Sequence, residues 1–141
     1  LTKIVGFDVA HLALEAAASR MKLDRRGAKK SERIDLWHGS LYYSDARLSG
    51  FDAAVLADVV QYLPQERLAE MERVVFQQAC PNTVVVMLNG AKRDEDASAD
   101  GWSAKRFDAW ASGVSERSGY RIRLLSPGSS QQAIRMAVFS K

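Results

Sequence analysis

The sequence predicts one α/β domain over residues 1–141, with a mostly parallel, doubly wound sheet and an antiparallel hairpin at its C-terminal edge. Apolar segments of strand length alternate along the chain with segments of helical periodicity. One of them, 51–58, is a continuous apolar run, which is typical of a strand buried on both faces of a parallel sheet. The last two strand-like segments have no helix between them, so we expect them to pair antiparallel.

The first four elements follow from composition and spacing. Residues 3–10 form an apolar strand that ends in an acid. The alanine-rich segment 11–23 carries apolar residues at helical spacing, which predicts a helix. Residues 33–41 alternate in polarity and stop at a Gly-Ser pair, as a strand does at its end. The run 51–58 is the third strand.

The second half of the chain predicts two helices and three strands. A proline, Pro64, suits the first turn of the first of these helices. Ser103 is a candidate N-cap of the second helix, and Gly119 is its expected stop. In chain order the five elements are 64–79, 82–88, 103–119, 120–126 and 133–140.

The composition limits the classes of protein to which the chain can belong. The 141 residues are 47% hydrophobic and 26% charged, which is ordinary for a soluble globular domain. No apolar run approaches the length of a membrane span, so we expect no membrane partner. The single cysteine, Cys80, excludes an internal disulfide framework and fits a cytoplasmic location. A net charge of +3 permits a polyanionic partner without demanding one.

Polar residues stand at the ends of two predicted strands. Asp8 ends the first strand directly before a helix, where a carboxylate could accept both hydroxyls of a nucleotide ribose or could cap the helix. Ser40 ends the second strand, where it could contact an adenine edge or belong to a simple turn. His11 and His38 have no acid at metal-ligand spacing, and we interpret both as structural. The chain contains no glycine-rich phosphate loop.

Several segments together resemble a known family. They occur in order over nearly the whole chain, and they are "IVGFDVAHLALEAAASRM", "GSLYYSDARLSGFDAAVLADVVQYL", "LAEMERVVFQQACPNTVVVMLN", "WSAKRFDAWASGVSERSGYRI" and "RMAVF". This set is similar to the catalytic domain of the small-RNA 3′-terminal ribose 2′-O-methyltransferases, the HEN family. The resemblance implies a Rossmann-like fold that uses S-adenosylmethionine to methylate an RNA 3′ end. It also implies that Asp8 holds the cofactor ribose and that Ser40 lies near the adenine.

The metal site of that family is degenerate here. The family places two glutamates and a histidine in the pattern Glu-x-x-Glu-His-Leu after a strand, with a second histidine from a later loop. The corresponding residues of this chain are Asp58, Gln61, Tyr62 and Ser98. Asp58 is the one good ligand among them, because an amide oxygen, a protonated phenol and a hydroxyl bind dications weakly. The sequence therefore puts a divalent metal in doubt.

The first strand and helix of the family fold are absent from this chain. The family begins with a glycine-rich strand, turn and helix that contact the methionine part of the cofactor and supply the middle strand of the sheet. Because the chain starts at Leu1 with a strand already under way, we expect an upstream segment of the same parent protein to supply them. Without it, we expect a gap in the sheet.

Three functions remain open at this stage. The first is an S-adenosylmethionine-dependent RNA methyltransferase with weak or metal-independent activity. The second is a catalytically inactive module that binds RNA or protein through the basic segment 20–33 and the aromatic residues Tyr42, Tyr43 and Trp102. Each of these aromatic residues could instead be a packing residue, which is the more common role. The third is a metal-independent methyltransferase that acts on a small molecule.

Overall fold

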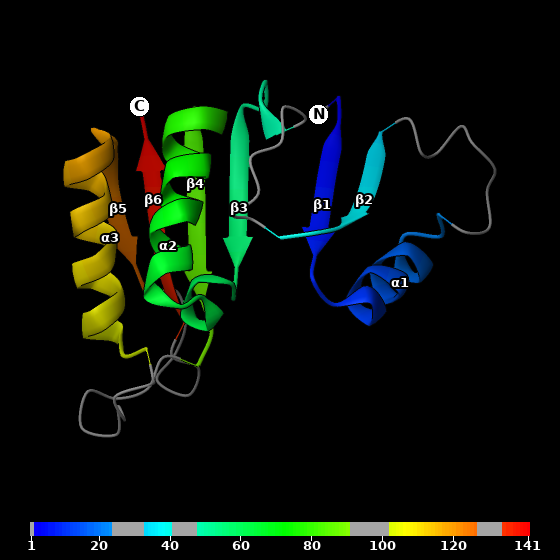
Figure 1. The fold of residues 1–141 in the computed structure, drawn as a ribbon, viewed down its shortest axis with the longest axis horizontal. Helices are drawn as coiled ribbons and strands as arrows, with labels where there is room; N and C mark the ends of the chain where they lie inside the picture. Colours follow the sequence, from blue (N-terminus) through cyan, green and yellow to red (C-terminus); the bar gives the residue numbers. More distant parts are fainter. Residues whose placement is uncertain (1, 24–32, 41–47, 91–101, 127–133) are drawn as a thin grey trace. The chain divides into compact units, whose positions relative to one another are not determined.

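A computed structural model describes residues 2–23, 33–40, 48–90, 102–126 and 134–141 (Figure 1). The elements in chain order are β1 (Ile4–Asp8), α1 (His11–Arg20), β2 (Ile34–His38), β3 (Ala53–Ala57), η3 (Val60–Tyr62), α2 (Gln65–Glu72), η4 (Arg73–Ala79), β4 (Thr83–Leu88), α3 (Ala104–Ser118), β5 (Arg121–Leu125) and β6 (Arg135–Ser140). They divide into two compact units, 1–43 and 44–141. Within the described ranges, no helix has the length and apolarity needed to cross a membrane.

The first unit is small and open. Its strands β1 and β2 pair in parallel, from Ile4 opposite Ile34 to Asp8 opposite His38. Helix α1 packs against both strands, but none of its residues is buried. A two-stranded sheet with one short helix buries little apolar surface, so this unit has no closed core of its own among the described residues.

The second unit is a four-stranded sheet in the order β3-β4-β6-β5. Strands β3 and β4 are parallel, and β6 runs antiparallel to both β4 and β5. The last two strands therefore pair antiparallel at one end of the sheet, as predicted, with β6 as the strand that joins them to β4. Helices α2 and α3 lie over one face of this sheet (Figure 1).

Side chains that point to the helix-covered face form the core. Burial alternates along β4, where Val84, Val86 and Leu88 are buried and their neighbours are half-buried. Phe139 of β6 is fully buried and meets Phe76 edge to face at 5.0 Å between ring centroids. The alternation is the expected signature of a sheet with one covered face.

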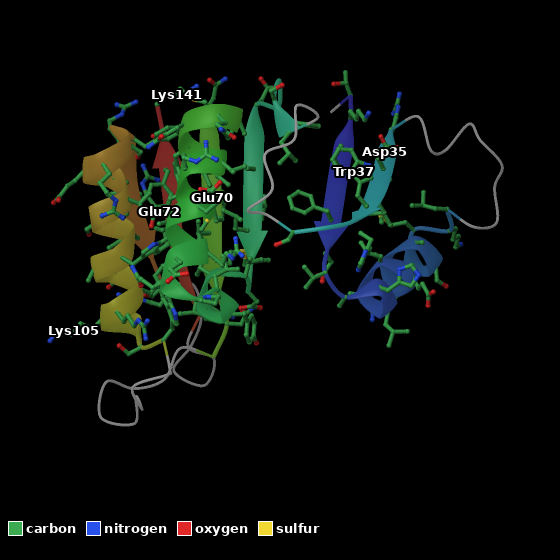
Figure 2. The ribbon with its side chains drawn as sticks, in the orientation of Figure 1. Asp35, Trp37, Glu70, Glu72, Lys105 and Lys141 are labelled. Atoms are coloured by element: carbon green, nitrogen blue, oxygen red, sulfur yellow. The ribbon has the colours of Figure 1, made fainter. Side chains whose placement is uncertain are left out.

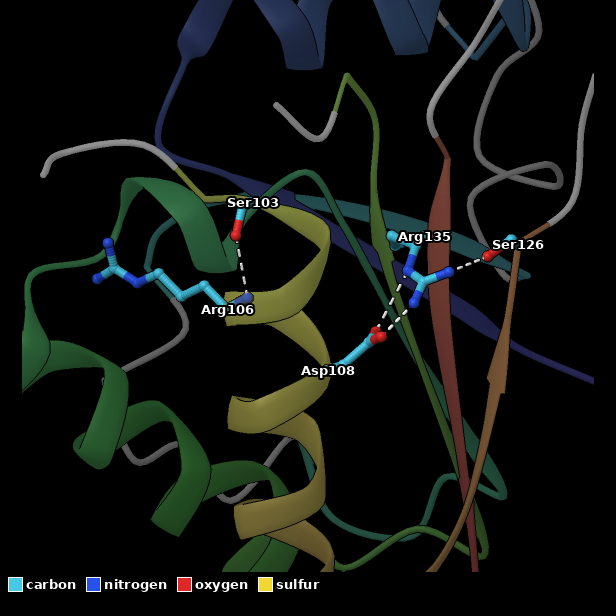
Figure 3. A network of polar contacts seen from close by, with 5 residues as sticks. All are labelled: Ser103, Arg106, Asp108, Ser126 and Arg135. Atoms are coloured by element: carbon cyan, nitrogen blue, oxygen red, sulfur yellow. Dashed lines mark hydrogen bonds and ion pairs between the residues drawn. The ribbon is translucent and has the colours of Figure 1, made fainter. Parts of the chain in front are cut away.

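Helix α3 begins and ends where the sequence predicts. The Ser103 hydroxyl accepts a hydrogen bond from the Arg106 backbone N–H at 3.1 Å, and Gly119 ends the helix in the left-handed conformation, with φ of 76°. Asp108 in the middle of the helix pairs with Arg135 of β6, which also contacts the Ser126 hydroxyl (Figure 3). The cap fixes the start of α3, and the ion pair ties the helix to the sheet.

Helix α2 continues as a π-helical segment, η4, which the sequence did not predict. Glu72, labelled in Figure 2, stands at the junction. Its carboxylate accepts hydrogen bonds from the Trp110 indole at 2.8 Å and from the Arg117 guanidinium at 2.9 Å, both on α3. A π-helix is wound more widely than an α-helix, so its side chains point in different directions. At this junction Glu72 links α2 to α3.

The described strands form two separate sheets, because no pairing joins β1 to β3 within the described residues. Among the described strands, two pairings are parallel and two are antiparallel, so the predicted α/β class is confirmed with mixed rather than mostly parallel strand directions. The prediction of one domain over 1–141 is not tested by this division into units.

Candidate functional site

The carboxyl ends of β1 and β2 lie side by side in the first unit. The Gly39 N–H donates to the Asp8 carbonyl at 3.1 Å, which places Ser40 on the strand end next to Asp8. The Asp8 carboxylate accepts a hydrogen bond from the Ala10 N–H at 2.7 Å, just before α1 begins. Asp8 thus holds the turn into the helix, and its side chain remains exposed at the end of the strand.

The two histidines have structural contacts, as predicted. His11 is the first residue of α1 and lies edge to face with His38 at 5.7 Å between ring centroids. His38 Nε2 donates to the Val9 carbonyl at 3.0 Å. His11 also lies 3.5 Å from the Glu15 carboxylate one turn along the helix. The rings support the β1–α1 turn that carries Asp8.

In the second unit, the end of β3 is held to the end of β4. Asp58 follows β3 with φ of 54°, a left-handed conformation that aspartate tolerates better than most residues. Its N–H donates to the Met87 carbonyl at 3.0 Å, and its Oδ1 accepts from the Asn89 N–H at 2.7 Å. The Asn89 side-chain amide donates to Asp58 Oδ2, and Gln61 Nε2 donates to Oδ1 at 3.2 Å.

These bonds determine the charge state of Asp58. Partial burial raises its pKa, whereas the hydrogen bonds from the backbone and side chain of Asn89 and from Gln61 lower it. The lowering prevails, so the pKa of Asp58 lies below its ordinary value and the carboxylate is ionised at neutral pH.

The family of the chain follows from its similarity to solved structures. The methyltransferase domain of a bacterial Hen1 protein, CtHen1, is 34% identical, with a TM-score of 0.85, over all of this chain and 79% of that one. The chain belongs to the Hen1 family. The small RNA 2′-O-methyltransferase of Rattus norvegicus is 28% identical over 139 residues, and this chain spans about a third (35%) of its length. No protein-family model matches the chain.

A more distant likeness agrees with the fold. The TehB-like SAM-dependent methyltransferase from Corynebacterium glutamicum superposes with a TM-score of 0.63 at 16% identity, over 99% of this chain and 68% of that one. At this identity the likeness concerns the fold alone. This Hen1-family chain therefore has the Rossmann-like methyltransferase fold that the family resemblance implies.

The metal-site residues of the Hen1 family do not fit a dication in this chain. Both Asp58 oxygens already accept hydrogen bonds from amides. The Gln61 Oε1 atom is buried and has no hydrogen-bond partner, and the Tyr62 side chain points outward with 77% of its surface exposed. Ser98 lies outside the described residues. Within those residues, no three His, Cys, Asp or Glu side chains are grouped to hold a metal ion.

The structure supports a packing role for Trp102 and not a base-stacking one. Trp102 is only 7% exposed, because its ring packs edge to face against Phe107 and Trp110 and the Arg106 guanidinium lies 5.0 Å from its centre. It cannot serve as an open platform for a base. Tyr42, Tyr43 and most of the basic segment 20–33 lie outside the described residues.

Sequence reasoning missed Asn89. Its partner Asp58 is 31 residues earlier, so no local pattern connects them. The available signal was topological: two strands separated by one helix are expected to be parallel neighbours, and the residues that follow their carboxyl ends then meet at one edge of the sheet. The structure groups Asp8 with Ser40 and, separately, Asp58 with Gln61 and Asn89.

Proposed function

We propose that the chain is the larger part of an S-adenosylmethionine-dependent methyltransferase domain that modifies a ribose hydroxyl at an RNA 3′ end. The observation that carries this proposal is the 34% identity and TM-score of 0.85 to the CtHen1 methyltransferase domain over the whole chain. The named activity of the rat relative, small RNA 2′-O-methylation, supports the same substrate class.

The first unit supplies the cofactor side of the proposed site. Asp8 stands exposed at the end of β1, and one of its oxygens is oriented by the Ala10 N–H. A carboxylate held in this way can still accept the two hydroxyls of a ribose. Ser40 follows the adjacent strand end and offers a hydroxyl for the adenine. These two assignments are predictions that rest on strand position and chemistry.

The second unit supplies the acceptor side. When bound, S-adenosylmethionine would supply a sulfonium-bound methyl group: the ribose oxygen would form the new bond to this carbon as the carbon–sulfur bond breaks, which would leave S-adenosylhomocysteine and release the hydroxyl proton to solvent. A metal-bound hydroxyl would lose its proton readily. Because Asp58, Gln61 and Tyr62 do not fit a dication, we expect slow transfer that does not depend on added metal.

An additional strand completes the proposed domain. Within the described residues, β1 pairs only with β2, and β3 pairs only with β4, so each strand has one open edge. Both are apolar strands of a parallel sheet without a charged residue in their interior, which suits pairing with a further strand rather than exposure to water. We assign that strand to an upstream segment of the parent protein.

We further propose that the protein acts in the cytoplasm.

Isothermal titration calorimetry of the full-length protein with S-adenosylmethionine tests the proposal. We expect saturable heat in the wild type and at least about tenfold weaker binding in Asp8→Ala, since a charge-assisted hydrogen bond contributes about 1.5–3 kcal/mol. Asp52→Asn is the matched control, because this exposed aspartate stands before the first residue of β3, whereas Asp8 stands at the carboxyl end of β1. Absence of heat with the cofactor at millimolar concentration would reject the proposal.

A catalytically inactive RNA-binding module is the second candidate, and the amide-bonded state of Asp58 favours it. RNA affinity measured across a salt series separates the two. An inactive module that binds phosphates would lose affinity steeply as salt rises while it transfers no methyl group. Incorporation of labelled methyl into a 3′-terminal ribose would identify the enzyme instead.

A further inference from the structure

The strand ends of the second unit contain a polar arrangement that no family assignment explains. We define the amide clamp as Asp58, Gln61 and Asn89. Three neutral N–H donors converge on one carboxylate: the Asn89 backbone, the Asn89 side chain and the Gln61 side chain. The clamp joins the turn after β3 to the end of β4 across a separation of 31 residues.

The clamp satisfies the carboxylate without a cation. An ionised carboxylate has about four lone-pair positions on two oxygens, and three are in use here. Two of the three donors come from the same residue, Asn89, whose backbone follows β4 and is held by the sheet. A dication at Asp58 would compete with these hydrogen bonds for the carboxylate, and it would find no second anionic ligand on Gln61 or Tyr62.

The orientation of the Gln61 amide supports the same conclusion. Its nitrogen faces the carboxylate, whereas the reversed amide would set its oxygen against a negative charge. Its remaining oxygen is buried and meets no donor. A glutamate at this position would bring a second carboxylate within about 3 Å of the first, an arrangement that needs a proton or a cation between them.

We propose that Asn89 is a positioning residue which, with Gln61, holds Asp58 as a hydrogen-bond acceptor in place of a divalent cation. This inference rests on the proposed function only in treating these strand ends as the acceptor side of the domain. Two consequences follow for cation binding. Removing an amide donor should raise the affinity of the cluster for cations modestly, and replacing a donor with an acid should raise it further.

Manganese titration of the full-length protein, followed by the electron paramagnetic resonance signal of free Mn²⁺, tests the clamp. We expect wild type to bind more weakly than about 1 mM, because one carboxylate with neutral neighbours is a poor site. The double variant Gln61→Glu, Tyr62→His restores two strong ligands, and we expect at least about tenfold tighter binding. Gln77→Glu is the control, since it adds the same charge at an exposed position of η4.

Asn89 has its own test. Asn89→Ala frees Asp58 Oδ2, so we expect Mn²⁺ affinity to rise by about threefold or more, which a purely structural loss would not produce. Asn82→Ala is the matched control, because it removes an exposed asparagine at the opposite end of β4. Both variants are compared by circular dichroism, so that a fall in folded fraction is measured separately.

Two results would overturn the inference. The first is submillimolar Mn²⁺ binding by wild type that disappears in Asp58→Asn, which needs no redesigned variant. The second is a folded Gln61→Glu, Tyr62→His protein with unchanged Mn²⁺ affinity. Neither depends on cofactor binding. A protein that follows the expected metal pattern but gives no heat with S-adenosylmethionine would reject the proposed function and leave the clamp intact.

Discussion

The two units of this chain differ in how they are stabilised. Every buried apolar side chain of the described residues belongs to the second unit, from Leu56 to Phe139. In the first unit, α1 has no buried residue and Leu12 is 79% exposed. Both units have parallel strands with polar residues at their carboxyl ends. The difference shows that the second unit is built on a closed core, whereas the described residues of the first unit bury no apolar side chain.

Hydrogen exchange should show the largest contrast. Amides of β4 and β6 lie inside a four-stranded sheet, so they exchange through global unfolding, whereas those of β1 and β2 open locally. We expect protection to differ by at least about two orders of magnitude, as measured by exchange mass spectrometry of the 141-residue chain. Equal protection in the two units would contradict the comparison. A gain in protection confined to residues 4–8 when S-adenosylmethionine is added would sharpen the comparison between the two units.

A pair of phenylalanine variants tests the core contribution directly. Phe139→Ala removes a fully buried ring that packs against Phe76, and we expect a loss of about 3–5 kcal/mol in the free energy of unfolding. Phe7→Ala removes a half-buried ring of β1, so we expect less than half of that loss. Urea unfolding followed by circular dichroism measures both. A larger loss for Phe7→Ala would show that the first unit carries the core.

The order of elements could be predicted because each one has a local signature. The Ser103 cap and the Gly119 stop of α3 are determined by residue chemistry within one helical turn, and the structure confirms both. Apolar runs of strand length predicted all six strands to within three residues. Parallel pairing then followed from the alternation of strands and helices.

Contacts between distant residues could not be predicted in the same way. The bonds from Asn89 to Asp58 and from Trp110 to Glu72 join residues 31 and 38 positions apart, and no periodicity encodes them. For Trp102 the sequence left both packing and base stacking open, and the aromatic cluster with Phe107 and Trp110 settles its burial. The π-helical winding of η4 likewise has no local sequence rule.

The ion pair between α3 and the sheet should have a smaller effect. Asp108→Asn leaves the Arg135 guanidinium without its charged partner at a half-buried position. We expect a loss of about 1 kcal/mol in unfolding free energy, since both side chains keep some contact with water. Glu116→Gln, an exposed change on the same helix, is the control. Equal effects of the two variants would mean that the pair does not hold α3 to the sheet.

The smallest expected effect compares the aspartates at the strand ends, Asp58 in one unit and Asp8 in the other. Because the folded-state pKa of Asp58 is lowered, its ionised form contributes stability above its unfolded pKa, and this contribution is lost as the pH falls through the lower folded value. We therefore expect Asp58→Asn to unfold at lower urea concentration than wild type from pH 5 to 7. The difference should shrink below about pH 4, where the wild-type carboxylate takes up a proton. Asp8→Asn is the matched control, because an asparagine oxygen can accept the one bond from Ala10. The stability difference between wild type and Asp58→Asn could also stay constant down to about pH 2.5, well below the usual aspartate pKa. That result would show that the geometry of the amide bonds, and not the charge, holds the end of β3.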